Sequence, residues 1–173
     1  AMVVVWMALA ANGVREGEMG DMLGYGDFDP TVDDTWGRVP AMGWADVTAS
    51  AHPDVEAGGR YYGWFPVVGT VDLSVTPTRH GLRDDGEHRH AHAPVHRTFA
   101  DSRSAPPAPT GFVDAEELGD LEDRQALLRG LFLTGFLADA FFEHNDWFGA
   151  RRAVVLSASS KTAIAFADCA SQR

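Results

Sequence analysis

The sequence predicts a mixed α/β fold in which a β-rich N-terminal part precedes a helical C-terminal part. Three observations predict it. Short runs of β-branched and aromatic residues, punctuated by glycine, fill residues 37–75. A strongly apolar helical pattern follows over residues 125–145, and residues 150–167 read as a strand, a tight turn and a helix. The boundary between the two parts is predicted near residue 104.

The composition limits the classes of function. The chain has 173 residues, of which 45% are hydrophobic, and a formal net charge of -11. Nucleic acids and anionic membranes are bound by clustered Lys and Arg, so this acidic balance predicts neither partner. The single cysteine, Cys169, cannot form an intramolecular disulfide and is predicted to be a small buried hydrophobe. A reducing compartment fits this cysteine usage, and we expect a cytoplasmic protein.

The N-terminal run over residues 2–11 is predicted to be a buried strand, closed by the turn dipeptide Asn12-Gly13. No basic residue precedes the run, and its β-branched residues favour a strand over a signal peptide. The run is also too short for a transmembrane helix. Residues 19–34, which are rich in glycine and acidic residues, are predicted to be mainly loop.

Further strands are predicted in the β-rich part. Residues 38–47 are predicted to form two short strands, with Pro40 at an edge or a bulge. After a turn at residues 53–59, strands are predicted at residues 60–69 and 71–75. Short strands at this spacing indicate a small barrel or sandwich.

Residues 79–109 are predicted to be a long loop or linker, because histidines and prolines stand where a strand would carry aliphatic residues. His88, His90 and His92 alternate and could lie on one face of an extended segment, which is a pattern that can bind a metal ion. No cysteine or firmly placed carboxylate completes such a site. We therefore predict a solvated loop that binds no metal. We also expect no zinc elsewhere in the protein.

The strongest predicted helix covers residues 125–145, and the acidic residues at 118–123 suit its N-terminus. His144 near its C-terminus is interpreted as a partner of the helix dipole rather than a catalytic base. A helix that is apolar around most of its circumference is usually buried in an interface or against a sheet. The apolar residues are Leu127, Leu128, Leu131, Phe132, Phe136, Leu137, Ala140 and Phe141.

The candidate site is the turn between the last predicted strand and the last predicted helix. Such a turn directs backbone N–H groups and the positive end of the helix dipole at a nucleotide phosphate, and small side chains let a pyrophosphate come close. The predicted cofactor-binding residues are Ser157, Ala158, Ser159, Ser160, Lys161, Thr162 and Ala163. Ser157, Ser160 and Ala163 stand where a dinucleotide fingerprint has glycine, so an ordinary strand-to-helix turn is the alternative.

A P-loop is a second alternative for the same turn. Residues 155–162 have the length of the pattern G-x-x-x-x-G-K-[ST] and end in Ser-Lys-Thr. Val155 and Ser160 replace the two glycines that let a P-loop backbone wrap a phosphate. Nucleotide hydrolysis by a P-loop is therefore a weaker interpretation than dinucleotide binding. Lys161 is a candidate phosphate ligand in both interpretations.

The order of elements resembles the medium-chain dehydrogenase/reductase superfamily, in which a GroES-like barrel precedes a Rossmann domain. More narrowly, the chain resembles the DUF2855 family, a divergent branch of that superfamily. The motifs that carry the resemblance lie at residues 37–40, 63–66, 111–114, 127–132, 148–150 and 157–163. One departure is Gly58-Gly59-Arg60, where the superfamily usually has Gly-Asp-Arg.

The resemblance implies a domain organisation. Residues 1–104 would be a partial GroES-like β domain with the His/Pro-rich loop, and residues 105–173 would be a linker helix and the start of a Rossmann nucleotide-binding domain. In this interpretation the chain is a fragment that contains the pyrophosphate turn but not the rest of a Rossmann site. We therefore expect the chain alone to bind a dinucleotide weakly.

The resemblance also implies a zinc-independent NAD(P)H-dependent oxidoreductase, with NADP(H) as the expected cofactor. Zinc enzymes of the superfamily hold their metals with several cysteines, and this chain has one. The expected partner is a small-molecule substrate; the substrate and the catalytic residues are not assigned, and self-association is left open. The alternative is a non-catalytic nucleotide-binding or scaffold protein that kept the fold.

Overall fold

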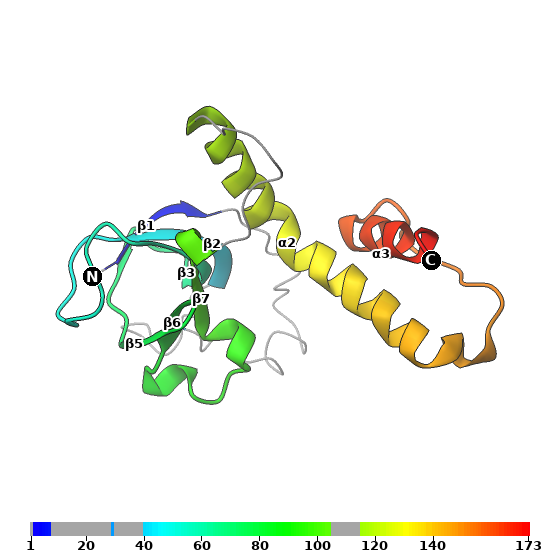
Figure 1. Ribbon diagram of the computed structural model, residues 1–173, viewed down its shortest axis with the longest axis horizontal. Coiled ribbons are helices and arrows are strands. Elements are labelled where there is room, and N and C mark those ends of the chain that lie inside the picture. Colours follow the sequence, from blue (N-terminus) through cyan, green and yellow to red (C-terminus); the bar gives the residue numbers. More distant parts are fainter. Residues whose placement is uncertain (1, 8–28, 30–39, 105–114) are drawn as a thin grey trace, which may run out of the picture. The chain divides into compact units, whose positions relative to one another are not determined.

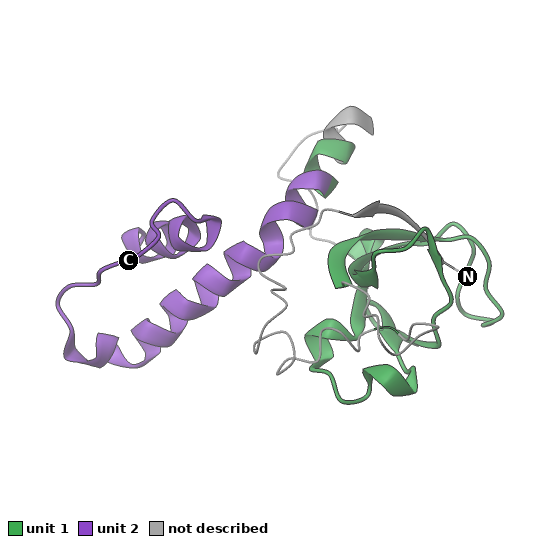
Figure 2. Ribbon diagram, turned by 180° about the vertical axis from the view of Figure 1, so that it is seen from behind, with its two compact units in different colours: residues 1–122 green, residues 123–173 purple. Residues whose placement is uncertain are grey.

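The structure is a computed structural model that describes residues 2–7, 29, 40–104 and 115–173. In this part of the chain β strands come first and α helices follow, which confirms the predicted mixed α/β class with a β-rich N-terminal part (Figure 1). The chain forms two compact units, residues 1–122 and residues 123–173 (Figure 2). The helix α2 contributes its first turns to the first unit and the rest to the second.

The first unit is built on one sheet with the strand order β4-β1-β2-β3-β7-β6-β5. Every neighbouring pair in it is antiparallel. The longest ladder joins β2 to β3 and runs from Pro40 opposite Pro66 to Asp46 opposite Arg60. The strands are β1 (Met2–Met7), β2 (Pro40–Val47), β3 (Arg60–Pro66), β4 (Thr70–Val71), β5 (Val75–Thr78), β6 (Gly81–Asp84) and β7 (Thr98–Asp101).

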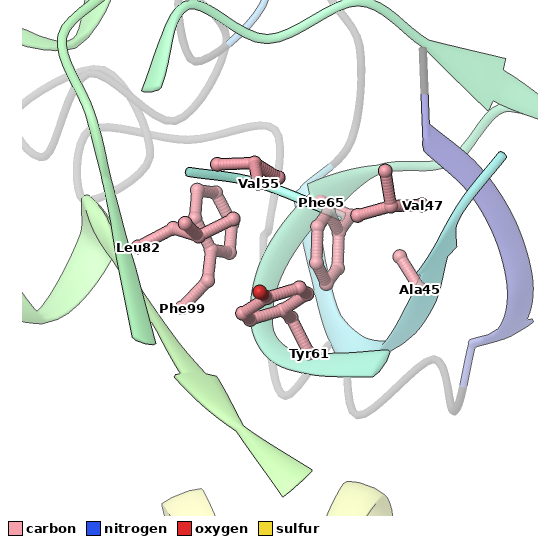
Figure 3. Close-up of a cluster of buried hydrophobic side chains, with 7 residues drawn as sticks. All are labelled: Ala45, Val47, Val55, Tyr61, Phe65, Leu82 and Phe99. Carbon is pink, nitrogen blue, oxygen red and sulfur yellow. The ribbon is translucent and has the colours of Figure 1, made fainter. Parts of the chain in front are cut away.

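The core of the first unit is built from side chains of β2, β3, β6 and β7 together with Val55. The rings of Phe65 and Phe99 stack there with centroids 4.8 Å apart. Gly63 is required beside them, because a Cβ at this position would overlap the ring of Phe99. Seven buried side chains form the cluster shown in Figure 3: Ala45, Val47, Val55, Tyr61, Phe65, Leu82 and Phe99.

Several strand predictions need correction. Residues 40–47 form a single strand instead of two, and Pro40 is its first residue, where the missing N–H is tolerated. The strand predicted over residues 2–11 is confirmed over residues 2–7, and the remainder lies outside the described residues. The strand predicted at 71–75 is wrong in its bounds, because β4 ends at Val71 and β5 begins at Val75.

The loop predicted over residues 79–109 is also wrong where the structure describes it. This segment contains β6, β7 and three short 3₁₀ turns, η2 (Glu87–Arg89), η3 (Pro94–His96) and η4 (Ser102–Ser104). Each of the two strands sends one large apolar side chain into the core, Leu82 from β6 and Phe99 from β7. In each of these four-residue strands a single large apolar residue packs in the core, although the surrounding sequence is polar. Residues 105–109 lie outside the described residues.

Ion pairs and hydrogen bonds join the first turns of α2 (Ala115–His144) to the sheet within the first unit. The guanidinium of Arg60 donates from Nε to Oε1 of Glu122 at 2.9 Å and from Nη2 to Oε2 at 2.6 Å. Arg60 also pairs with Asp46, and the two carboxylates raise the pKa of the guanidinium further above its usual value. The indole of Trp44 donates to the backbone oxygen of Glu122 at 3.2 Å. These contacts fix the helix at Glu122.

The helix α2 is longer than the sequence predicted, since it begins at residue 115 and contains the acidic lead-in. Its predicted burial is wrong for six of the eight apolar residues, which are about half exposed, from Leu128 at 42% to Phe141 at 56%; Leu131 and Ala140 are partly buried. Composition decides how much apolar surface a helix offers, but not what covers it.

In the described residues, Gly119–His144 is also the one stretch long and apolar enough to span a membrane, a test that core helices of soluble proteins pass as well. The expected absence of a membrane partner stays a prediction.

The second unit ends with α3 (Lys161–Ser171), which follows η5 (Asp146–Gly149) and an extended segment. The strand predicted near residues 153–156 forms no sheet pairing with the described residues, and Val154 and Leu156 are 85% and 82% exposed. An isolated segment becomes a strand only when a neighbour accepts its backbone hydrogen bonds. Cys169, predicted to be buried, is a free and half-buried thiol of α3.

Candidate functional site

The turn before α3 closes on itself through two hydrogen bonds. The backbone N–H of Ser160 donates to the carbonyl oxygen of Ser157 at 2.8 Å. Ser160 is the N-cap of the helix, and its Oγ accepts a hydrogen bond from the backbone N–H of Ala163 at 3.1 Å. Serine is a favoured residue at this position because its oxygen satisfies an N–H that has no partner within the helix.

Ser157 has a left-handed backbone conformation, with φ of +54°. Residues with a Cβ avoid this region, and glycine usually fills it. Ser157 was predicted to replace the first glycine of a dinucleotide fingerprint, but a G-x-G-x-x-G pattern that includes Ser160 and ends at Ala163 begins at Ala158. The backbone at this position therefore adopts the conformation that glycine would permit, although the residue is serine.

The other two substituted glycine positions have different explanations. Ser160 is extended, with φ of -71° and ψ of 145°, and serves as the cap. Ala163 is 8% exposed and faces the interior of the unit. Position 163 needs a small residue because it is buried, and position 160 needs a side chain that can accept the capping hydrogen bond.

The first turn of α3 offers hydrogen-bond donors to a ligand. The backbone N–H groups of Lys161 and Thr162 point out of the helix start, and within the described residues neither is used in a hydrogen bond. The first turn contains no acidic residue, and Lys161 is exposed. This arrangement favours an anion, because N–H groups, the helix dipole and an ammonium group act in the same direction.

A cavity of about 540 Å³ adjoins the turn inside the second unit. Its wall comes from α2, the extended segment and α3. Of the predicted site residues, Ser160, Thr162 and Ala163 line the cavity, while Ser157, Ala158, Ser159 and Lys161 belong to the exposed turn. The remaining lining is mostly apolar and includes Ala138, Phe142, Trp147, Val154, Val155, Leu156 and Phe166.

The aromatic side of this cavity was missed by sequence reasoning. The rings of Phe142 and Trp147 stack with centroids 5.5 Å apart, and Phe166 meets Phe142 edge-on at 6.0 Å. A signal was present in the sequence, because aromatic residues cluster from Phe141 to Phe148 at the end of the helical pattern. The pattern could not show which of these rings would turn toward α3.

An unusual backbone turn places Trp147. Asp146, Trp147, Phe148 and Gly149 all have positive φ, at 49°, 49°, 51° and 74°. For residues with a Cβ this conformation costs about 1 to 2 kcal/mol each, so the surrounding contacts must hold it. The stacking of Trp147 on Phe142 and the contact of Phe148 with Phe141, at 5.8 Å between centroids, supply such contacts.

Close packing between the two helices sets the position of α3 within the unit. A Cβ on Gly135 of α2 would lie 2.7 Å from the backbone nitrogen of Phe166 and 2.9 Å from Cβ of Ala165. The absence of a side chain at Gly135 therefore lets the backbones of α2 and α3 approach. Near the other end of α3, Arg173 Nη2 lies 2.6 Å from Oδ2 of the buried Asp139.

The histidine-rich segment does not form the extended face that the sequence predicted. His88 lies in the 3₁₀ turn η2, and His90 Nε2 is 3.1 Å from the carbonyl oxygen of Asp85. Among the residues that the structure describes, no three His, Cys, Asp or Glu side chains are arranged to hold a metal ion. The absence of a bound metal in solution stays a prediction.

Comparison with known proteins gives one family. The model of the family described as "Protein of unknown function (DUF2855)" matches residues 7–173, which include the candidate turn, most of the first unit and the whole of the second. No curated protein and no solved structure matches the chain.

Proposed function

The chain belongs to the DUF2855 family, and we propose that it binds a dinucleotide, NADP(H), through the turn at residues 157–163. The observation that carries the proposal is the left-handed Ser157 followed by the capped start of α3. We further propose that the protein is a zinc-independent NAD(P)H-dependent oxidoreductase of the medium-chain reductase type, acting on a small-molecule substrate in the cytoplasm.

The residues present fit the pyrophosphate part of such a cofactor. Ser157, Ala158 and Ser159 are small and exposed, so a phosphate can approach the backbone. The N–H groups of Lys161 and Thr162 are available to donate hydrogen bonds to its phosphate oxygens. The ammonium group of Lys161 adds a charge-assisted contact with a phosphate oxygen.

The fit is confined to this part of the cofactor. When bound, NADP(H) would supply hydride transfer, and the task of the protein is to bind and orient it and to exclude water. The cavity beside the turn contributes apolar surface from Phe142, Trp147 and Phe166. Because Ser160 and Thr162 belong to both the turn and the cavity wall, a ligand held at the turn would border this dry surface.

A non-catalytic nucleotide-binding protein is the second candidate, and one observation favours it. Among the described residues that line the cavity, Arg152 is the only one with an ionisable side chain. Arginine stays protonated at physiological pH, so it cannot serve as a general acid or base there. Thermal stabilisation by NADPH, with no NADPH oxidation in the presence of quinone or carbonyl substrates, would support this candidate over the oxidoreductase.

Titration with NADPH tests the binding proposal, and it is followed by NMR because the chain alone is expected to bind weakly. Lys161→Ala should weaken binding by about 1 to 3 kcal/mol, a factor of roughly 5 to 150 in Kd, the range for a charge-assisted hydrogen bond. Arg129→Ala is the matched control, since it removes an exposed cation of α2 outside the turn and should leave Kd unchanged. Equal affinity of the wild type and Lys161→Ala, with both chains folded by circular dichroism, would reject the proposed role of Lys161.

A further inference from the structure

The cavity beside α3 has a mostly apolar lining that contains one charged residue, Arg152. It lies wholly in the second unit, and the structure describes every residue of that unit. Its volume of about 540 Å³ falls inside the range of about 300 to 1,000 Å³ in which proteins hold small organic molecules. Such sites combine apolar walls with a few polar groups. The composition of this lining is therefore typical of a ligand site.

Three aromatic rings form one side of the cavity. Phe142 and Trp147 stack with an angle of 16° between their planes. The ring of Phe166 completes the group, with its centroid 6.0 Å from that of Phe142 and 6.1 Å from that of Trp147. Aromatic rings interact best with another flat ring, in offset-stacked or edge-to-face geometry. This wall favours a ligand with a planar ring.

Arg152 has no counter-ion among the described residues. Its side chain is exposed and forms no ion pair or hydrogen bond with them. Two acidic residues of α2, Asp139 and Glu143, are engaged by Arg173. No acidic residue lines the cavity. A guanidinium in this situation binds a carboxylate well, because its planar fork donates two parallel hydrogen bonds to the two oxygens.

The charge of the lining also limits the charge of the ligand. One cation with no acidic residue matches a single negative charge. A ligand with more charges would place some of them against apolar walls, where a charge without a partner is costly. A neutral ligand would leave Arg152 without a counter-ion.

We propose that this cavity binds a planar aromatic molecule that carries one carboxylate group. The ring packs against Phe142, Trp147 and Phe166, and the carboxylate pairs with Arg152 at the exposed side. As a binding site, the cavity does not require a dinucleotide. As the class of substrate of this protein, the aromatic carboxylate rests on the oxidoreductase function proposed above.

An NMR titration of the ¹⁵N-labelled full chain with 2-naphthoate tests the proposal. The control ligand is 2-naphthamide, which has the same ring system without the charge. We expect 2-naphthoate to shift the indole N–H signal of Trp147 and the backbone amide signal of Phe166. It should bind about tenfold or more tightly than 2-naphthamide, which is the gain expected from a charge-assisted hydrogen bond.

A pair of neighbouring arginines supplies matched variants. Arg152→Gln removes the charge and should weaken 2-naphthoate binding about tenfold or more, while the affinity for 2-naphthamide stays within about twofold. Arg151→Gln is the control, because Arg151 is also exposed but does not line the cavity. It should keep the wild-type affinity for both ligands. Both positions are exposed, so neither change removes a buried contact.

Three results would overturn the proposal. They are equal affinity for the two ligands, equal effects of Arg152→Gln and Arg151→Gln, and signal shifts confined to the exposed residues of α2, such as Leu128 and Phe132. The outcome is separable from that for the dinucleotide. Binding of 2-naphthoate through Arg152 without any binding of NADPH would keep the cavity site and reject the proposed function. Binding of NADPH alone would do the reverse.

Discussion

Ser160 and Ala163 are joined by a hydrogen bond of 3.1 Å, in which the backbone N–H of Ala163 donates to Oγ of Ser160. This bond uses the N–H at the third position of α3 and leaves those of Lys161 and Thr162 for a ligand. The cap and the proposed anion site are therefore compatible. The serine stabilises the helix start without covering the donors that the site needs.

Ser160→Ala should destabilise the second unit by about 1 kcal/mol, because the N–H of Ala163 then loses its hydrogen-bond acceptor. Ser159→Ala is the control, since Ser159 is exposed and lies one residue before the cap. Urea unfolding followed by circular dichroism measures both. Equal stability of the two variants would show that the capping bond contributes nothing.

Ser157→Gly should stabilise the chain by about 1 kcal/mol, because glycine adopts φ of +54° without the penalty that a Cβ carries. Ser157→Val should have the opposite effect. If the turn holds a pyrophosphate, Ser157→Gly should also keep its affinity for NADPH. A loss of stability in the glycine variant, measured by thermal unfolding, would argue against a left-handed conformation at this residue.

Gly135→Ala should destabilise the packing of α3 on α2 by about 1 to 3 kcal/mol, as overpacking does elsewhere. The added Cβ would lie 2.7 Å from the backbone nitrogen of Phe166, and a backbone atom cannot move aside alone. Gly119→Ala provides the control in the same helix, because nothing lies within 4 Å of the added Cβ. It should stabilise the helix by up to about 1 kcal/mol through propensity. Calorimetric melting of both variants checks the contrast.

Much of the sheet could be predicted from the sequence because β2 and β3 carry a dense β pattern, including Trp44, Tyr61 and Phe65. The strands β6 and β7 could not, since each is four residues long and sends one large apolar residue, Leu82 or Phe99, into the core. Their placement depends on partners distant in sequence. A local pattern dominated by histidine and proline gives no sign of those partners.

The candidate site was predicted unevenly for a related reason. The start of α3 and its small polar residues follow from local sequence, and Ser160 caps the helix as its residue type favours. The stacking of Trp147 on Phe142 depends on the left-handed turn at residues 146–149, in which Asp146 and Gly149 are residue types that favour such a conformation but Trp147 and Phe148 are not. The exposure of α2 likewise depends on its neighbours, and not on its own apolar residues.

The most direct test of the proposed nucleotide site is an NMR titration of the ¹⁵N-labelled chain with NADPH and, separately, with inorganic pyrophosphate. At millimolar ligand even weak binding is visible, and adenosine, which lacks phosphate, is the control. We predict that both phosphate ligands shift the backbone amide signals of Lys161 and Thr162 the most, and that adenosine leaves them in place. Unchanged signals at these two residues, at concentrations that saturate shifts elsewhere or at the highest soluble concentration, would contradict the proposed site.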